Sequence, residues 1–533
     1  MHFNIADIME SLADAVPEND ALVSGSERRT YSELTNARTA WRIICSRVAS
    51  VRAITWGCIS TTVTSSSEVM LALLKIRAVG VNVNYRFVGP EVRHMIVDGD
   101  LKGMVTQRRF LPVINEANEG LPDLKALVVI DDGTDFTSTQ ESIEYESAMA
   151  LGSEARDFGE RSGDDLYIVY TGGTTGMPKG VMWRQEDLLF AGLQGGAPGG
   201  DPVETPEEIA QNAIEENYKV NMLPCAPFIH GAAQFTAWIC MFTGGKLVLQ
   251  PGPSFDAKRI LSLVAEEEAS TLTIVGDAMA YPLLEELKTG EYDMSNLFVL
   301  ASAGAILSPT NKAAIQELVP DCMIINSFGT SESGDLGRAA DGEQSVDGRP
   351  TFYMGEDVTV LDDDGNPVEP GSGAIGKLAR SGRLPLGYYK DPEKTADRFK
   401  EFNGKRWVVP GDFATVEEDG RITFLGRGSK CINTGGEKVF PEEVEEALKA
   451  HPDIIDALVV GVPDPRWGSK VAAVFSTKSN KQLSLDEVQE HCRNLVAGYK
   501  VPRSIHIETE VQRMPSGKPD YTWAETIARS AAS

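Results

Sequence analysis

Continuous runs of apolar residues alternate with amphipathic stretches over the first 350 residues of the chain. Strands that are buried on both faces have such continuous apolar runs. We predict six of them, at 124–130, 165–170, 245–249, 270–276, 297–302 and 322–328. A helix is predicted from Pro309, because Ser308 can cap its first turn and proline suits the first helical position. Strands and helices in alternation predict an α/β fold with largely parallel sheets.

The pattern changes near residue 352. The segments 358–378 and 413–425 contain Asp-Gly or Gly-Asn turns between apolar stretches, which is typical of β-hairpins. A stretch rich in Gly, Ser and Asn follows, and Pro441 then begins an amphipathic helix. We therefore predict a β-rich unit, a linker and a small C-terminal α+β domain.

Composition excludes several classes of protein. The formal net charge is −28, whereas a nucleic-acid-binding protein normally carries a basic face. The seven cysteines are odd in number and form no CxxC pair, so neither a zinc site nor a disulfide framework is expected. No apolar run approaches ~18 residues, so no membrane span is expected. The first residues lack a signal-peptide pattern, and the cytoplasm is the expected location.

A loop rich in Gly and Thr directly follows the predicted strand at 165–170. It reads YTGGTTGMPKG over residues 170–180. Small residues expose backbone N–H groups, and Lys179 adds a cation, so phosphate is the expected ligand. The Walker pattern does not fit, because Pro178 precedes the lysine and Gly180 follows it. A plain flexible loop is the alternative that this stretch alone leaves open.

Four further stretches occur in order after this loop. They are NSFGTSES at 326–333, VVPGDFA at 408–414, GRGSKCINTGGEKVFPEEVE at 426–445 and MPSGKPDY at 514–521. With the Gly/Thr loop they resemble the ordered motifs of the adenylate-forming superfamily, which contains acyl-CoA synthetases, adenylation domains and luciferases. The resemblance extends from about residue 5 to 525. Through GVMWRQEDL at 180–188, INTGGEKVFPEEVE at 432–445 and GYKVPRS at 498–504, the chain most resembles actinobacterial acyl-CoA synthetases that act on fatty or steroid side-chain acids.

The resemblance implies a fold and an activity. A large N-terminal domain, 1–428, would contain stacked αβ subdomains and a β-rich subdomain. A small, mobile domain, 429–533, would turn about a hinge near Ser429. With ATP and Mg²⁺, the enzyme would convert a carboxylic acid to an acyl-adenylate, and CoA would then displace AMP.

The resemblance also assigns residues to these steps. Lys518, Glu332 and Thr171 would be catalytic, with Lys518 bridging carboxylate and α-phosphate and Glu332 holding Mg²⁺. The loop over the β- and γ-phosphates would consist of Thr171, Gly172, Gly173, Thr174, Thr175, Gly176 and Lys179. The rest of the ATP site would consist of Gly304 and Phe328 at adenine, Gly329, Thr330 and Ser331 near the α-phosphate, Asp412 on both ribose hydroxyls, and Arg427. CoA would contact Gly435, Gly436 and Lys438, and His230 would line the acyl pocket.

Three alternatives remain. In the first, the acyl acceptor is a carrier-protein thiol or water instead of CoA. In the second, the activated acid is a medium-chain or aryl acid. The third alternative is a non-catalytic nucleotide-binding derivative, because residues 37–68 depart from the family pattern and are rich in Arg, Ser, Thr, Cys and Trp. That departure reflects either a compensated frameshift, in which case we expect poor packing of an N-terminal strand and helix, or divergence.

Overall fold

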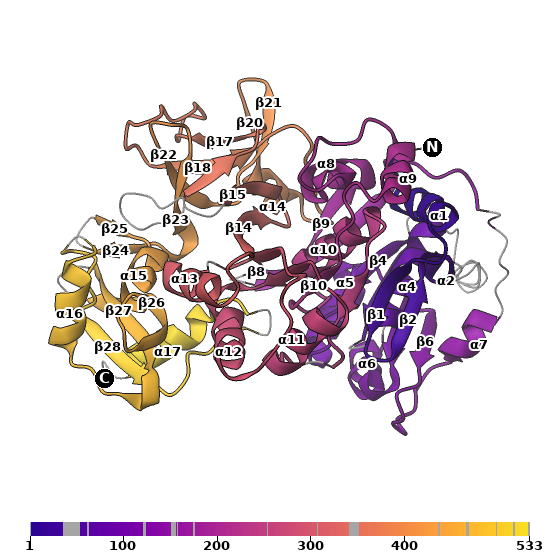
Figure 1. The fold of residues 1–533 in the computed structure, drawn as a ribbon, viewed down its shortest axis with the longest axis horizontal. Helices are drawn as coiled ribbons and strands as arrows, with labels where there is room; N and C mark the ends of the chain where they lie inside the picture. The colour runs from indigo at the N-terminus through magenta and orange to yellow at the C-terminus, as the bar shows by residue number, and fades with distance from the viewer. Residues whose placement is uncertain are drawn as a thin grey trace. The chain divides into compact units, whose positions relative to one another are not determined.

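The computed structural model describes fourteen parts of the chain: 2–35, 54–60, 63–120, 124–150, 156, 158–173, 176–252, 254–305, 307–339, 351–434, 437–464, 468–496, 498–514 and 517–530. The chain forms two compact units (Figure 1). The first comprises Met1–Thr273, Ser331–Gly334 and Arg383–Asp397, and the second comprises Ile274–Thr330, Asp335–Gly382 and Arg398–Ser533. Both mix helices and strands, which confirms the predicted fold class.

A five-stranded parallel sheet lies in the first unit. Its order is β4 (Val79–Asn82), β3 (Thr55–Ile59), β5 (Gly103–Gln107), β6 (Ala126–Ile130) and β7 (Ile143–Glu144). Its helices are α4 (Val63–Lys75), α5 (Gly89–Asp98), α6 (Leu111–Asn118) and α7 (Tyr145–Ala150). Neighbouring residues of one strand belong to different apolar cores, as Leu127 and Val128 do. The sheet is therefore buried on both faces, as its continuous apolar runs predict.

Strand β3 belongs to the segment that departs from the family pattern. It pairs with β4 on one side and β5 on the other, and Trp56 is fully buried. A Cβ atom added to Gly103 would lie 2.5 Å from the Trp56 ring, so only glycine allows this close approach. The poor packing expected from a frameshift is therefore not found in β3. Residues 36–53, 61 and 62 lie outside the described part of the chain.

A second sheet of the first unit has the order β2 (Glu27–Thr30), β1 (Asp20–Ser24), β11 (Leu247–Leu249), β10 (Met222–Pro224) and β12 (Thr271–Ile274). The pairs β1–β11, β10–β11 and β10–β12 are parallel. The helices α1 (Ile5–Ala15), α2 (Tyr31–Thr35), α8 (Gln185–Gly192), α9 (Pro206–Glu215), α10 (Gly231–Phe242) and α11 (Ala257–Glu266) complete the αβ part of this unit.

One predicted strand pairs differently from the others. Residues 165–170 lie in β8 (Leu166–Gly173), which pairs antiparallel with β9 (Gly176–Arg184), and β19 (Gly387–Tyr388) lies antiparallel against β9. The Gly/Thr loop therefore connects two strands of a hairpin, and no helix begins directly after it. A phosphate here would meet loop backbone rather than a helix N-terminus.

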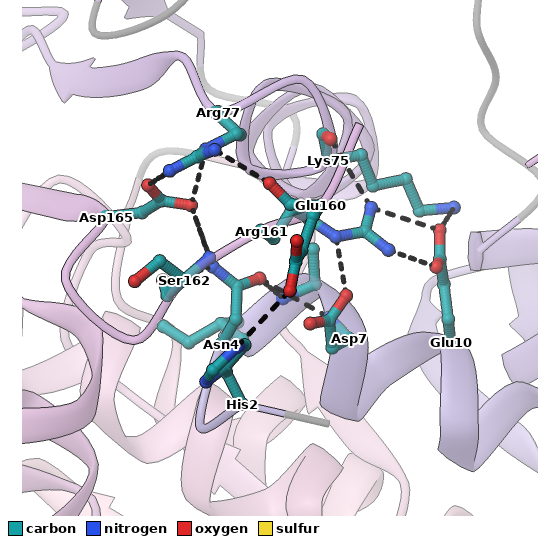
Figure 2. A network of polar contacts seen from close by, with 12 residues as sticks. His2, Asn4, Asp7, Glu10, Lys75, Arg77, Glu160, Arg161, Ser162 and Asp165 are labelled. Carbon is teal, nitrogen blue, oxygen red and sulfur yellow. Dashed lines mark hydrogen bonds and ion pairs between the residues drawn. The ribbon is translucent and has the colours of Figure 1, made fainter. Parts of the chain in front are cut away.

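A polar network joins α1, α4 and the segment before β8 (Figure 2). Arg161 donates to Asp7 at 2.6 Å and to Glu10, and Lys75 lies 3.4 Å from Glu10. Asn4 caps α1 with its side-chain oxygen and donates to the Ser162 carbonyl at 3.0 Å. Most of these groups are buried, so their mutual pairing offsets the cost of removing them from water.

In the second unit, a sheet begins with the parallel pair β13 (Val299–Ala303) and β14 (Met323–Thr330), beside α12 (Gly276–Thr289) and α13 (Pro309–Leu318). Ser308 caps α13 through the Asn311 amide, as the sequence predicts. The predicted β-rich unit is present. It contains β15 (Gly334–Ala339), β16 (Thr351–Met354), β17 (Val358–Leu361), β18 (Gly376–Arg380), β20 (Phe399–Phe402), β21 (Lys405–Val408), β22 (Asp412–Val416) and β23 (Ile422–Arg427). The short helix α14 (Pro392–Arg398) belongs to the first unit except for its last residue.

The C-terminal part of the second unit is a small α+β structure. Its strands are β24 (Ile432–Thr434), β25 (Glu437–Val439), β26 (Ile454–Asp464), β27 (Gly468–Thr477) and β28 (Ser504–Glu508). Helices α15 (Pro441–Lys449) and α16 (Leu485–Arg493) share one apolar core with the sheet, and α17 (Tyr521–Ser530) shares another. Among the described residues, every helix is too short or too polar to span a bilayer. The domain boundary at 428/429 stays a prediction.

Candidate active site

The base of the Gly/Thr loop is a regular antiparallel ladder. Thr171 lies opposite Lys179, and Gly173 lies opposite Gly176 after an irregularity in register. Thr174 and Thr175 lie outside the described residues. The hairpin therefore brings Thr171 and Lys179 together at the point where the loop begins.

Lys179 lies between two carboxylates. Its Nζ is 3.2 Å from Asp98 Oδ1 and 3.5 Å from Asp391 Oδ2, and the Tyr170 hydroxyl donates to Asp98 Oδ2 at 2.9 Å. Partial burial alone would lower the pKa of Lys179, but Asp98 and then Asp391 raise it above its usual value. The Lys179 ammonium is therefore charged, and Asp98 and Asp391 hold it at the base of the hairpin. Its contact with phosphate stays a prediction.

The hairpin also contacts the SFGTSE motif. Trp183 Nε1 in β9 donates to the Ser331 carbonyl at 2.9 Å. The Tyr388 hydroxyl in β19 donates to Glu332 Oε1 at 2.8 Å. Strand β19 pairs with β9, so one small sheet holds both the loop and the two groups that orient Ser331 and Glu332.

Helix α10 begins beside the same motif. A Cβ atom on Gly231 would lie 3.3 Å from Ser331 Oγ, and the preceding residue, His230, is half-buried at the N-cap of α10. Farther along the helix, a cavity of about 10 Å³ is lined by apolar side chains that include Leu71, Phe228 and Met241. This volume holds about one water-sized molecule, so it does not by itself define a pocket for a long acyl chain.

A second group of predicted residues meets within the second unit. Gly304 has a φ of +81°, and a Cβ atom on it would lie 3.8 Å from Lys518 Cε. A Cβ atom on the adjacent Gly517 would lie 3.1 Å from Val275 Cγ1. The C-terminal lysine therefore lies against the turn that the sequence assigns to adenine.

The predicted ribose ligand lies on the β-rich part of this unit. Asp412 is 1% exposed and lies opposite Arg427 in the β22–β23 ladder. The Phe328 ring lies 4.7 Å from the Phe424 ring and 5.7 Å from the Phe352 ring, centroid to centroid. Phe328 is therefore part of an aromatic cluster at the edge of the core.

The predicted site residues fall into two groups. The first unit holds Thr171, Lys179, His230, Ser331 and Glu332, and the second holds Gly304, Phe328, Gly329, Thr330, Asp412 and Lys518. Gly435, Gly436 and the side chains of Arg427, Ser429 and Lys438 lie outside the described part of the chain.

Sequence reasoning missed the residues that orient this site. Asp98, Asp391, Trp183 and Tyr388 hold the predicted residues in place. The sequence assigned a role to none of these four side chains, because a supporting side chain needs no motif of its own. Only their pairing across distant segments reveals them.

The chain belongs to the AMP-binding enzyme family. The profile of that family matches residues 10–389, and the profile of the AMP-binding enzyme C-terminal domain matches residues 443–518. The resemblance to adenylate-forming enzymes is thereby confirmed.

Individual relatives are similar over their whole length. The chain is 44% identical to a 3-oxocholest-4-en-26-oate–CoA ligase of Rhodococcus rhodochrous, covering 98% of this chain and 96% of the relative. It is 43% identical to a medium/long-chain-fatty-acid–CoA/3-oxocholest-4-en-26-oate–CoA ligase of Mycolicibacterium smegmatis, covering 99% and 97%. The crystal structure of the anthranilate CoA ligase AuaEII with anthranoyl-AMP has the same fold, with a TM-score of 0.84, 21% identity and coverage of 100% and 99%.

Proposed function

We propose that the chain is an ATP-dependent acyl-CoA ligase. It activates a carboxylic acid as an acyl-adenylate with release of pyrophosphate, and then transfers the acyl group to CoA with release of AMP. The identity of 44% over 98% of the chain to a relative named as a CoA ligase is the observation that carries this proposal. The meeting of Lys518 with Gly304 within one unit supports it.

Charge is the main obstacle to the first step. A carboxylate and a polyphosphate repel each other, so the site has to place cations and aligned donors where charge develops. We assign Lys518 to the bridge between carboxylate and α-phosphate. The assigned loop residues Thr171 to Gly176 surround the β- and γ-phosphates with backbone N–H groups and hydroxyls. Lys179 contacts these phosphates either after it separates from Asp98 and Asp391 or while it still pairs with them.

Glu332 suits the role of a Mg²⁺ ligand. A hard cation prefers carboxylate oxygen, and the Tyr388 hydroxyl orients this carboxylate by donating to Oε1, so Oε2 would be the metal ligand. The bound metal would neutralise part of the negative charge of the phosphates. Asp412 accepts from the ribose hydroxyls in this proposal, because one carboxylate can accept two hydrogen bonds from a vicinal diol.

The substrate is proposed from the relatives. Their names specify 3-oxocholest-4-en-26-oate and medium- or long-chain fatty acids, and we propose a long-chain fatty or steroid side-chain acid for this chain. Helix α10 has nine buried residues, most of them apolar, and His230 at its N-cap would line the entrance of the acyl pocket. A medium-chain or aryl acid is the second candidate.

The second step and the setting complete the proposal. Gly435 and Gly436 would let the pantetheine arm pass close to the backbone, and Lys438 would meet a CoA phosphate. The small domain, 429–533, would turn about Ser429 between the two steps. We place the enzyme in the cytoplasm.

The experiment is a panel of acids assayed for pyrophosphate and AMP release with and without CoA. We expect pyrophosphate exchange with long-chain or steroid side-chain acids and CoA-dependent AMP release. Exchange without a response to CoA would favour another acceptor. Binding of ATP and Mg²⁺ without pyrophosphate release for any acid would overturn the proposal.

A further inference from the structure

Asp277 is a buried carboxylate that joins three segments of the second unit. It is the second residue of α12 and is 4% exposed. Its Oδ1 accepts from the Ser308 backbone N–H and hydroxyl, both at 2.9 Å, and from Asn311 Nδ2 at 2.8 Å. Its Oδ2 accepts from Lys449 Nζ at 2.8 Å. Four donors thus meet one side chain, and the fourth comes from α15.

Lys449 is the last residue of α15 and is itself largely buried. It forms a second ion pair with Glu446 at 2.6 Å. Burial would lower the pKa of Lys449, but Asp277 and then Glu446 raise it above its usual value. Burial would likewise raise the pKa of Asp277, which Lys449 and the donors around Ser308 hold below its usual value. Both groups are therefore charged, and this is the state that a tight buried pair requires.

The residue before Asp277 is joined to the turn that lies against Lys518. The Gly276 N–H donates to Ser302 Oγ at 3.0 Å, and the Ser302 hydroxyl donates to the Ala305 carbonyl at 3.0 Å. Gly304, between them, is the residue that approaches Lys518. The start of α12 and the turn 302–305 thus form one hydrogen-bonded surface, and Gly517 and Lys518 lie against it.

The residues around Lys518 are also connected to α15, through strand β26. Arg513 donates to both oxygens of Asp456 at 2.8 and 2.6 Å, and the Met514 N–H donates to the Lys518 carbonyl at 2.8 Å. Asp456 lies in β26, which shares an apolar core with α15. A shift of α15 relative to α12 would therefore move Lys518 away from Gly304.

We propose that Asp277 and Lys449 form a positioning pair for the formation of the acyl-adenylate. The pair holds α15 against the start of α12 and so keeps Lys518 beside the turn 302–305. This inference rests on the proposed function, in which Lys518 acts in the first half-reaction. It adds two residues that are not themselves assigned to the binding of a substrate.

The test compares the two half-reactions in Lys449→Met. We expect the rate of acid-dependent ATP–pyrophosphate exchange to fall about ten- to hundredfold, while thioester formation from a supplied acyl-adenylate and CoA stays within about twofold. Lys449→Arg, which keeps the charge, is expected to recover a large part of the exchange rate. An equal loss in both half-reactions, or no loss in exchange, would overturn the proposal.

A matched control is a second ion pair made by the same helix. Lys500 pairs with Glu443 of α15 and is similarly buried, and this pair involves no residue of α12. Lys500→Met is expected to leave the ratio of the two half-reactions unchanged, and a change of that ratio like that in Lys449→Met would overturn the proposal. If Lys449→Met does not fold, the double variant Asp277→Asn/Lys449→Met takes its place, and the same ratio decides.

The failure of this inference differs from the failure of the proposed function. If wild-type protein exchanges pyrophosphate and Lys449→Met does so equally well, only the positioning pair is wrong. If wild-type protein exchanges pyrophosphate with none of the acids, the proposed function falls, and the positioning pair falls with it.

Discussion

The Tyr388 hydroxyl donates a 2.8 Å hydrogen bond to Glu332 Oε1, although 56 positions separate the two residues. The Lys394 ammonium lies 4.6 Å from the centre of the Tyr388 ring. The tyrosine therefore contacts a cation through its ring and the Glu332 carboxylate through its hydroxyl, and this hydrogen bond helps to orient the carboxylate that we assign to Mg²⁺.

Tyr388→Phe is expected to raise the Mg²⁺ concentration needed for half-maximal pyrophosphate exchange. Loss of one hydrogen bond to a charged group costs about 1.5–3 kcal/mol, which corresponds to roughly a ten- to hundredfold change. The measurement is the rate of exchange across a Mg²⁺ titration. Tyr389→Phe is the matched control, because its hydroxyl donates to Asp100 rather than to Glu332. Identical Mg²⁺ curves for both variants would contradict the role of Tyr388.

Lys518→Ala is expected to lower acyl-adenylate formation by roughly three orders of magnitude, because no other cation replaces its charge at the α-phosphate in our assignment. Thioester formation from a supplied acyl-adenylate is expected to survive. The two rates are measured separately, with Lys481→Ala, a change at a surface ion pair of the same part of the chain, as control. Unchanged adenylate formation would show that the assignment is wrong.

The buried ammonium of Lys75 makes stability depend on pH above neutrality. Burial lowers its pKa to about 8, although Glu10 opposes the shift. In the unfolded chain its pKa is about 10.4, so between these values the unfolded state binds more protons and the free energy of unfolding rises with pH. The full rise is about 3 kcal/mol.

This dependence is isolated by comparison with Lys75→Met. The variant lacks the titrating group. The free energy of unfolding of the wild type minus that of the variant should therefore increase as pH rises from about 8 to 10.5. Urea denaturation at several pH values in this range provides the measurement. A constant difference between the two proteins would rule out the shifted pKa.

Trp56→Ala tests whether the atypical segment contributes to stability. Removal of a fully buried aromatic side chain costs about 3–5 kcal/mol, and we expect a corresponding fall in the midpoint of denaturation. Trp407, which is half-buried, provides the control, and its replacement by alanine should cost less. Equal midpoints for wild type and Trp56→Ala would show that β3 is not a stabilising part of the core.

Much of the fold could be predicted, because its signals are local. The apolar run at 124–130 corresponds to β6, and the run at 322–328 corresponds to β14. The pairing of β8 could not be predicted in this way. An apolar run shows that a strand is buried, but its neighbours and their direction depend on residues far away in the sequence.

The candidate site was predictable only in part for the same reason. The motifs assign Glu332, Asp412 and Lys518 to the candidate site, because reacting groups follow fixed local patterns, and this assignment stays a prediction. They did not identify Tyr388 or Asp277, whose roles consist of contacts with distant segments.

The sequence by itself determined the alternation of strands and helices and the family, and it predicted which charged residues contact the nucleotide. The tertiary structure alone decided that Lys179 lies between Asp98 and Asp391, that Trp56 fills the space above Gly103, and that α15 is joined to α12 through a buried ion pair. Local patterns are set by neighbouring residues, whereas burial and charge pairing are set by groups that only folding brings within a few ångströms of each other.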